Sequence, residues 1–348
     1  MTVTIRDVAH AAGVSISTVS RALSSPEQVA AGTRVRVQDA ARSMGYRPNH
    51  AARGLITKRT GSIGLVVPDL ENPFFGSICK GVQARARSAG YAVFIGDTDE
   101  DPTIEADVVR SLVKQVDGLI LCSARCTDNA LERLAQNCRL VLINRRLGDI
   151  LSITFDEGGG VRALMRHLVA LGHRRIASAA GPEITWSDRE RCLAFRTFAA
   201  ESPELDLIEL GNFPPFFSGG VQAGDLAIAS GATAIVAFND LVAVGLLDRL
   251  CQRGVRVPHD ISVTGFDNVP VSRLVSPSLT TVNSPRVQMG RASVDLLLSS
   301  GPGGWGDLQP VREMPVELIV RESTGVTAIE RAPAGIAGSQ SVEPPFDP

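Results

Sequence analysis

Three side chains near the N-terminus, Ile16, Ser17 and Arg21, are of the types that read the edges of DNA bases. Arginine offers paired donors to guanine or phosphate, serine donates or accepts a hydrogen bond, and isoleucine can contact a thymine methyl group. A predicted helix over residues 16–23 exposes all three and buries Val19 on its other side. Taken alone, two helices joined by a glycine are also typical of an ordinary helical hairpin.

The segment RPNHAARGLITKRT, residues 47–60, holds four cations around a single exposed apolar candidate, Leu55. Asn49 can cap a short helix here, and Gly54 weakens that helix by about 1 kcal/mol relative to alanine. One interpretation is a flexible linker whose leucine packs locally. The other is a linker that becomes helical against the minor groove, with Leu55 wedged between base steps.

Polar and aromatic side chains follow several expected strands, and the carboxyl ends of strands are the usual ligand site in open α/β sheets. Phe74 or Phe75 could form an apolar or stacking wall, and Asn144 follows RLVLIN with Asp156 beside it at a predicted lobe junction. Trp186 is either a stacking platform or an exposed loop residue. Such side chains suit a polyhydroxylated ligand, because each hydroxyl needs a paired donor or acceptor.

Other chemistry is poorly supported by the sequence. The histidines are scattered, there is no GxSxG or HExxH motif, and the glycines at 158–160 lack a phosphate-loop context, which favours a permissive helix start. Six cysteines form no CxxC pair and have no zinc-site spacing, so we expect buried, reduced thiols and neither metal nor other cofactor. Charged residues near the N-terminus interrupt any secretory apolar region, and no run reaches the ~20 apolar residues of a membrane span. We therefore expect a cytosolic protein.

The charge of the chain is divided unevenly. The 348 residues have a net charge of −2. Residues 1–60 carry nine basic and three acidic side chains and hence +6, so the remainder carries −8. This asymmetry favours an electrostatic partner for the basic part only. A solvated basic surface is the alternative.

Three short helices are expected to position the N-terminal residues. The first covers residues 5–12, with Thr4 as its N-cap and Gly13 as its end, and Ser15 can cap the second. We expect Thr33 to cap a third helix that continues to about residue 44. Its apolar positions are Val35, Val37, Ala40 and Ala41. The tight turn between the first two helices matches a helix-turn-helix arrangement.

From residue 62 onwards, apolar strands alternate with helices in two successive sets. The expected strands are 62–68, 91–96, 117–122 and 139–144, then 174–180, 205–210, 233–238, 260–266 and 315–323. The expected helices are 73–89, 103–115 and 127–137, then 158–171, 188–200, 219–230, 239–253 and 286–299. This alternation predicts doubly wound parallel sheets, and two sets predict two α/β lobes with a cleft between them. The tail from Val326 has no periodicity, so we expect it to be disordered.

The motifs TIRDVAHAAGVSISTVSRALS, GYRPNHAARGL, GSIGLVVPDLENPFF, LGHRRIA, FND and GFDN together resemble the LacI/GalR family of bacterial transcriptional regulators. The resemblance runs from about residue 4 to residue 321. It implies an N-terminal all-α helix-turn-helix head with a hinge helix, then a two-lobed α/β core like a periplasmic binding protein. The boundaries we expect are 1–46 for the head, 47–60 for the hinge, 61–325 for the effector-binding and dimerisation domain, and 326–348 for the tail. The resemblance also implies a homodimer that lies in the bacterial cytoplasm and is associated with the nucleoid.

The resemblance also implies roles for individual residues. Contacts to the DNA backbone are expected from Thr4, Ser15, Thr18, Arg21, Thr33 and Asn49. Base contacts are expected from Ile16, Ser17 and Arg21, with Leu55 as the minor-groove lever. Arg191 in WSDRER would grip hydroxyls or a carboxylate, and Asn239 and Asp267 would be polar effector contacts. Two alternatives stay open, because Arg191 can form an intramolecular ion pair and the other two can cap helices.

We therefore expect a repressor that binds a pseudo-palindromic operator and is controlled by a sugar or sugar derivative held between the lobes. A change in the setting of the lobes would alter the spacing of the paired hinges. Whether the effector acts as inducer or corepressor is open. A free solute-binding protein would need a signal peptide and no basic head, and an enzyme would need a catalytic constellation. The tail carries no leucine heptad, which favours a dimer over a tetramer.

Overall fold

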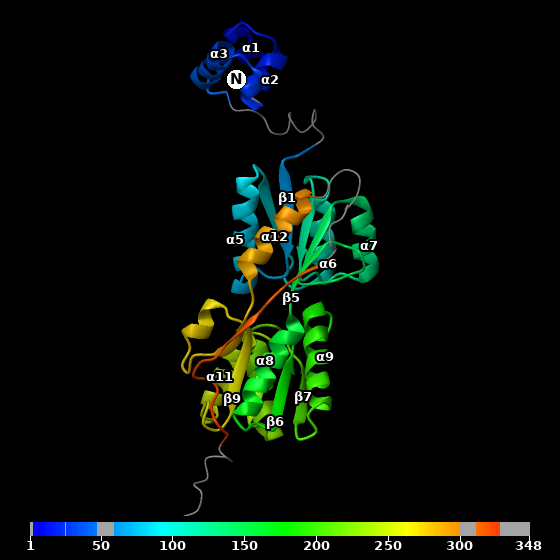
Figure 1. Ribbon diagram of the computed structural model, residues 1–348, viewed down its shortest axis with the longest axis vertical. Coiled ribbons are helices and arrows are strands. Elements are labelled where there is room, and N and C mark those ends of the chain that lie inside the picture. The colour runs from blue at the N-terminus through cyan, green and yellow to red at the C-terminus, as the bar shows by residue number, and fades with distance from the viewer. Residues whose placement is uncertain (1–2, 25, 47–58, 300–310, 328–348) are drawn as a thin grey trace, which may run out of the picture. The chain divides into compact units, whose positions relative to one another are not determined.

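The computed structural model describes residues 3–24, 26–46, 59–299 and 311–327 (Figure 1). The chain divides into two compact units. One consists of Met1–Ser62 with Gln115–Asp117, and the other of Ile63–Lys114 with Gly118–Pro348.

The N-terminal unit contains the three helices that the sequence predicts. They are α1 (Ile5–Ala12), α2 (Ile16–Ser24) and α3 (Ala31–Ser43), with a short 3₁₀ helix η1 (Pro26–Gln28) between the last two. Thr4 precedes α1, and its N–H and hydroxyl each donate to the Asp7 carboxylate at 2.8 Å. The Ser15 hydroxyl accepts from the Thr18 N–H at 3.2 Å, which confirms Ser15 as a cap of α2.

The helices pack on a small apolar core whose fully buried members are Val8, Val19, Ala22 and Val37. The prediction for the start of α3 was wrong. The helix begins at Ala31, where the Ala30 carbonyl accepts from the Arg34 N–H at 3.0 Å, and Thr33 lies inside its first turn. The first intrahelical hydrogen bond is thus accepted by Ala30, and the N-cap has no side-chain hydrogen bond. Val35, expected to be an apolar core position, is 51% exposed.

The second unit contains two six-stranded sheets, as the two sets of strands predict. The first has the order β11 (Val311–Met314), β5 (Ser152–Phe155), β4 (Leu140–Ile143), β3 (Leu119–Cys122), β1 (Ser62–Val67) and β2 (Ala92–Asp97). The second has the order β12 (Glu317–Ile319), β10 (Thr280–Asn283), β9 (Ser262–Asp267), β8 (Ala234–Ala237), β6 (Arg175–Ala180) and β7 (Asp206–Asn212). The registered pairs are parallel except β10 with β12, which is antiparallel.

Helices accompany each sheet and define two lobes. The first lobe has α5 (Pro73–Ser88), α6 (Pro102–Leu112), α7 (Asp128–Asn137) and α12 (Arg286–Ser299). The second has α8 (Glu157–Ala170), α9 (Trp186–Ala200), α10 (Phe217–Ser230), α11 (Asp240–Gln252) and the 3₁₀ helix η2 (Pro270–Arg273). Figure 1 shows α12, although last in sequence, lying beside α5. The chain therefore crosses between the lobes after β5, after β10 and after β11.

Four details differ from the sequence expectations or refine them. The strands β5, β10 and β11 were not predicted, and the strand expected over 315–323 is reduced to Glu317–Ile319. Thr327, placed in the disordered tail, is 3% exposed and its N–H donates to the Leu171 carbonyl at 3.1 Å. Residues 328–348 lie outside the described part of the chain. All six cysteines are free thiols, but burial is confirmed only for Cys79 and Cys122. It was wrongly predicted for the half-buried Cys126, Cys138 and Cys192 and for the exposed Cys251.

The glycines at 158–160 lie in the first turn of α8, as expected of a permissive helix start. A Cβ atom on Gly160 would lie 2.7 Å from the Phe266 ring, so this position needs glycine for close packing. No helix among the described residues has the length and apolarity that crossing a membrane requires. The same residues contain no group of His, Cys, Asp and Glu side chains arranged to hold a metal ion.

Candidate functional site

The helix α2 presents one polar face to solvent. Ile16 is 45% exposed, and Ser17 and Arg21 are exposed beside it, whereas Val19 on the opposite side is fully buried. The Ser15 hydroxyl lies 2.9 Å from that of Ser17, and the Arg21 Nε donates to the Ser17 carbonyl at 3.4 Å. No carboxylate in the described part of the chain pairs with Arg21. Its guanidinium charge is thus available to an external acceptor.

The remaining residues predicted to contact DNA are distributed around this helix. Thr4 and Ser15 are exposed, and Thr18 and Thr33 are half-buried. Thr18 is held by a hydrogen bond between its hydroxyl and that of Ser15 at 2.8 Å. Asn49 and Leu55 lie outside the described residues. The backbone contact predicted for Asn49 and the minor-groove role predicted for Leu55 therefore stay predictions.

A cavity lies within the second unit, where the carboxyl ends of strands from both lobes meet. Its volume is about 30 Å³, which is room for one or two water molecules. Five of the seven residues predicted for the effector line it. They are Phe74, Asn144, Arg191, Asn239 and Asp267.

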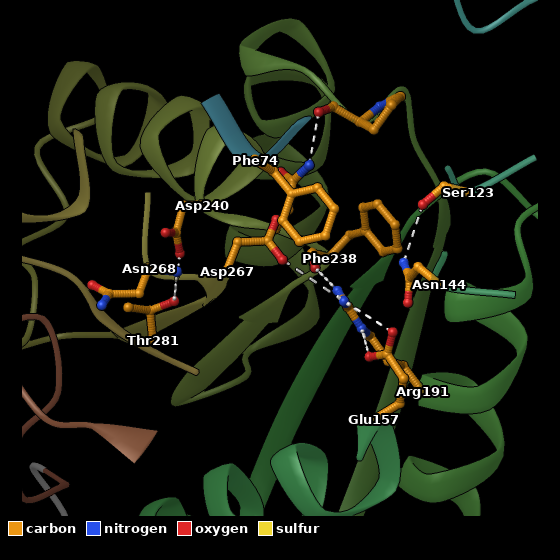
Figure 2. A network of polar contacts seen from close by, with 12 residues as sticks. Phe74, Ser123, Asn144, Glu157, Arg191, Phe238, Asp240, Asp267, Asn268 and Thr281 are labelled. Carbon is orange, nitrogen blue, oxygen red and sulfur yellow. Dashed lines mark hydrogen bonds and ion pairs between the residues drawn. The ribbon is translucent and has the colours of Figure 1, made fainter. Parts of the chain in front are cut away.

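Arg191, on α9, is the centre of a buried polar network (Figure 2). Its Nε donates to the Glu157 carboxylate at 2.6 Å, and the two side chains are 6% and 2% exposed. Its Nη1 donates to the Phe238 carbonyl. The guanidinium carbon lies 3.6 Å from the centroid of the Phe266 ring, and Nη2 lies 3.9 Å from Asp267 Oδ1. The ion pair that the sequence left open as an alternative is therefore present, at a residue that also faces the cavity.

Three buried carboxyl groups surround this network, and burial raises the pKa of each. The pKa of Glu157 rises to about 7, opposed by the adjacent Arg191 guanidinium. Burial raises the pKa of Asp267 to about 6, opposed by Arg191 and Arg286. The pKa of Asp240 rises to about 8 through burial and then repulsion by Asp267. The Asp240 carboxyl accepts from the Thr281 hydroxyl at 2.6 Å (Figure 2). Two arginines, Arg191 and Arg286, therefore face three carboxyl groups whose pKa values are raised.

Asn144 approaches the cavity from the first lobe. It follows β4 in the left-handed region at φ 56°, a conformation that asparagine tolerates better than most residues. Its Nδ2 donates to the Ser123 hydroxyl at 3.2 Å (Figure 2). Its Oδ1 is buried and accepts from no described residue. Because a buried acceptor without a donor is costly, this oxygen marks a place where a ligand donor would be favourable.

Asn239 and Asp267 approach the cavity from the second lobe. Asn239 caps α11, accepting from the Val242 N–H at 2.8 Å, and donates to the Pro215 carbonyl at 2.9 Å. It therefore serves as a cap and lines the cavity as well. Asp267 ends β9 with φ 106° and is 6% exposed.

Two residues predicted for the effector do not line the cavity. Asp156 caps α8, accepting from the Gly159 N–H at 2.6 Å, and lies 3.8 Å from Arg162. Trp186 is the first residue of α9 and is half-buried, with the Arg146 guanidinium 5.9 Å from its ring centroid. Asp156 was indicated by its place at the predicted lobe junction and Trp186 by its place in the WSDRER segment, but their side chains are used elsewhere.

A charged pair of the first lobe, Arg125 and Glu100, lines the same cavity and was not predicted from the sequence. The Arg125 Nε donates to the Glu100 carboxylate at 2.6 Å, and the arginine side chain is 4% exposed. The Glu105 carboxylate accepts from the backbone N–H groups of Arg125 and Cys126 at 2.8 and 2.9 Å and fixes this loop. Arg125 comes three residues after β3, so the strand-end rule that indicated Asn144 could have found it.

Comparison with known proteins gives the family. Residues 4–49 match the model of bacterial regulatory proteins of the lacI family, and residues 165–324 match a periplasmic binding protein-like domain. The chain is 34% identical over 333 residues to the HTH-type transcriptional regulator DegA of Bacillus subtilis strain 168, which covers 93% of this chain and 98% of the relative.

Two solved structures are similar over most of the chain. The Lac repressor dimer bound to operator and the anti-inducer ONPF has a TM-score of 0.83 at 30% identity, covering 93% of this chain and 100% of that one. A LacI family regulator from Enterococcus faecium with bound ribose has a TM-score of 0.66 at 28% identity, covering 76% of this chain and 99% of that one. The helix-turn-helix head and the two-sheet core predicted from the sequence are thereby confirmed. The chain belongs to the lacI family of bacterial regulatory proteins.

Proposed function

We propose that the protein is a repressor that binds operator DNA as a homodimer through α2. A small, uncharged, polyhydroxylated ligand in the cavity between the lobes sets its operator affinity. The ligand is bound and released unchanged, and the protein acts in the cytoplasm. The Lac repressor is a dimer in its operator-bound structure, which supports both the DNA partner and the homodimer.

The exposed face of α2 supports the DNA role. A helix-turn-helix places this part of its second helix against base edges in the major groove. Ile16, Ser17 and Arg21 supply an apolar contact, a hydroxyl and a guanidinium without a competing carboxylate among the described residues. The basic excess of residues 1–60 supplies attraction to phosphates.

The charge state of the cavity supports an uncharged ligand. Each arginine that lines it already has a carboxylate partner, Glu100 for Arg125 and Glu157 for Arg191. Asp267 adds a further acid. A sugar acid or a nucleotide would bring its negative charge to a site without spare positive charge, whereas hydroxyl groups need only hydrogen-bond partners. The ribose bound by the Enterococcus faecium regulator is a ligand of this class.

The buried Oδ1 of Asn144, which has no donor among the described residues, is the observation that carries this proposal. A ligand hydroxyl would donate to it, while Phe74 and Phe238 offer ring surfaces to the C–H face of a sugar. Because the cavity holds only about 30 Å³, a sugar enters only if the lobes separate. Ligand occupancy thus changes the setting of the lobes, and through it the hinge spacing that operator binding requires.

The test is a thermal-shift screen of neutral sugars, sugar acids and nucleotides. A ligand that binds only the folded state raises the melting temperature by mass action. We expect neutral sugars to stabilise the wild type and the exposed control Asn137→Gly, but not Asn144→Gly. Glycine is the chosen replacement because it adopts the left-handed conformation of Asn144 without strain. Stabilisation by anionic ligands alone, or by a neutral sugar equally in Asn144→Gly, would contradict the proposal.

A further inference from the structure

Asp117 binds the chain at the point where the linker after the head ends. Its Oδ1 accepts from the Thr60 N–H at 2.6 Å and from the Thr60 hydroxyl at 3.0 Å. Its Oδ2 accepts from the Gly61 N–H at 3.0 Å. The partners are 56 and 57 residues apart in sequence, so these contacts belong to the tertiary structure. One carboxylate therefore receives three donors from two consecutive residues.

The local backbone is shaped to present those donors. Gly61 has φ 67°, a left-handed conformation that turns consecutive N–H groups towards one acceptor, as in anion-binding nests. The Ser62 N–H donates to the Thr60 hydroxyl at 3.2 Å. The Asp117 N–H in turn donates to the Ser62 carbonyl at 2.8 Å. The contact is thus a closed ring of hydrogen bonds, here called the Asp117 clamp, made by Thr60, Gly61, Ser62 and Asp117.

We propose that Asp117 is a positioning residue for operator binding, which fixes the point at which the linker joins the ligand-binding core. The inference rests on the proposed function. Ser62 begins β1, and Asp117 is followed two residues later by β3, the neighbouring strand of the same sheet. The clamp therefore joins the last linker residues to the starts of two adjacent strands. When these strands of the first lobe move, Thr60 and Gly61 move with them.

Without the clamp, Thr60 and Gly61 would be free to sample other backbone conformations. A specific operator complex would then have to order them again, and that ordering opposes binding. Non-specific binding depends on the attraction between the basic residues of the head and the DNA phosphates. A substitution of Asp117 leaves those basic residues unchanged. The clamp is therefore expected to affect specific operator binding selectively.

The first test measures the clamp itself by limited trypsin digestion. Trypsin cleaves after Lys58 and Arg59, and both cuts require the following residues to enter the protease in an extended form. In Asp117→Ala we expect these two cuts to accelerate about tenfold relative to cuts after Arg47 and Arg53, because protection by local structure is lost. The control Asp107→Ala removes an equally acidic but exposed side chain of α6 and should not change the ratio. An unchanged ratio in Asp117→Ala would overturn the clamp.

The second test measures operator affinity, using the sequence that the wild type enriches from random duplex DNA. We expect Asp117→Ala to weaken binding to that operator about tenfold, or about 1.4 kcal/mol, and to leave binding to a scrambled duplex unchanged. Asp117→Asn keeps one acceptor oxygen and should give an intermediate loss. Equal losses on both duplexes would indicate general damage and overturn the positioning role, as would no loss on either. If the wild type enriches no sequence, the proposed function fails, while the digestion still decides whether the clamp exists.

Discussion

Replacing Arg191 by methionine removes the cation of the buried network and leaves an unbranched apolar side chain that is two atoms shorter. The guanidinium carbon lies 3.6 Å from the Phe266 ring centroid and 5.0 Å from that of Phe238, and methionine is too short to fill its place, so a packing loss adds to the polar losses. Glu157, with a side chain 2% exposed, keeps its carboxyl group but loses the guanidinium 2.6 Å away. The Phe238 carbonyl loses its donor as well. An unsatisfied buried acceptor of this kind costs about 1–3 kcal/mol at any pH.

A further loss depends on pH, and its sign follows from the pKa of Glu157. In the wild type that pKa is raised from 4.5 to about 7, so the folded form holds a proton that the unfolded form has lost between these values. The contribution of Glu157 to the free energy of unfolding therefore falls as pH rises to 7 and then levels off. Without Arg191 the pKa rises further, and the variant goes on losing stability above pH 7. The difference in free energy of unfolding between wild type and variant, here called the gap, should therefore widen above pH 7, by up to about 1.4 kcal/mol per pH unit while the pH stays below the raised pKa of the variant.

Urea unfolding at pH 6, 7, 8 and 9, followed by circular dichroism, measures this gap. The double variant Glu157→Gln with Arg191→Met has no carboxyl group to ionise, so its gap to the wild type should stay constant above pH 7. A gap between Arg191→Met and the wild type that does not widen from pH 7 to pH 9 would refute the reasoning. So would an equal widening in the double variant.

Three further predictions concern packing, ionisation and base reading. Gly290→Ala should lower the free energy of unfolding in urea by about 1–3 kcal/mol, because its Cβ would lie 2.3 Å from the Ile78 carbonyl oxygen. The control is Gly76→Ala, whose Cβ would meet open space, and equal effects of the two substitutions would contradict the prediction. Asp240→Asn should become more stable relative to the wild type as pH rises from 4 to 8, by up to about 1.4 kcal/mol per pH unit, because burial raises the pKa of Asp240 to about 8. Parallel pH profiles of the free energy of unfolding for the two proteins would argue against this. Arg21→Ala should lose about 1–3 kcal/mol on the selected operator, measured by fluorescence anisotropy against a scrambled duplex; an equal loss on both would remove Arg21 from base reading.

The sequence predicted the strongly periodic elements of the fold and missed the short ones. Long apolar runs such as Ser62–Val67 are buried along their whole length and are recognisable on that ground. The strands β5 and β10 have only four residues each and are rich in serine and threonine, so they lack an apolar run. They form because neighbouring strands supply their hydrogen bonds, which no local pattern shows.

The site was predicted in part, because position after a strand identifies a residue but not the direction of its side chain. Asn144 and Asp267 line the cavity, whereas Asp156 is used as a helix cap. Arg125 follows β3 and could have been found by the strand-end rule, but no local signal indicates that it pairs with Glu100. The clamp at Asp117 was missed for the same reason, since its partners lie 57 residues away.

The central claim is that a ligand in the cavity controls operator binding. Its most direct test is the operator dissociation constant of the wild type with and without a saturating neutral sugar from the thermal-shift screen, measured in parallel on Asn144→Gly. We expect a change of about 5- to 150-fold in the wild type, the usual range of allosteric coupling, and no change in the variant. An operator affinity of the wild type that stays the same when the sugar occupies the cavity would contradict it.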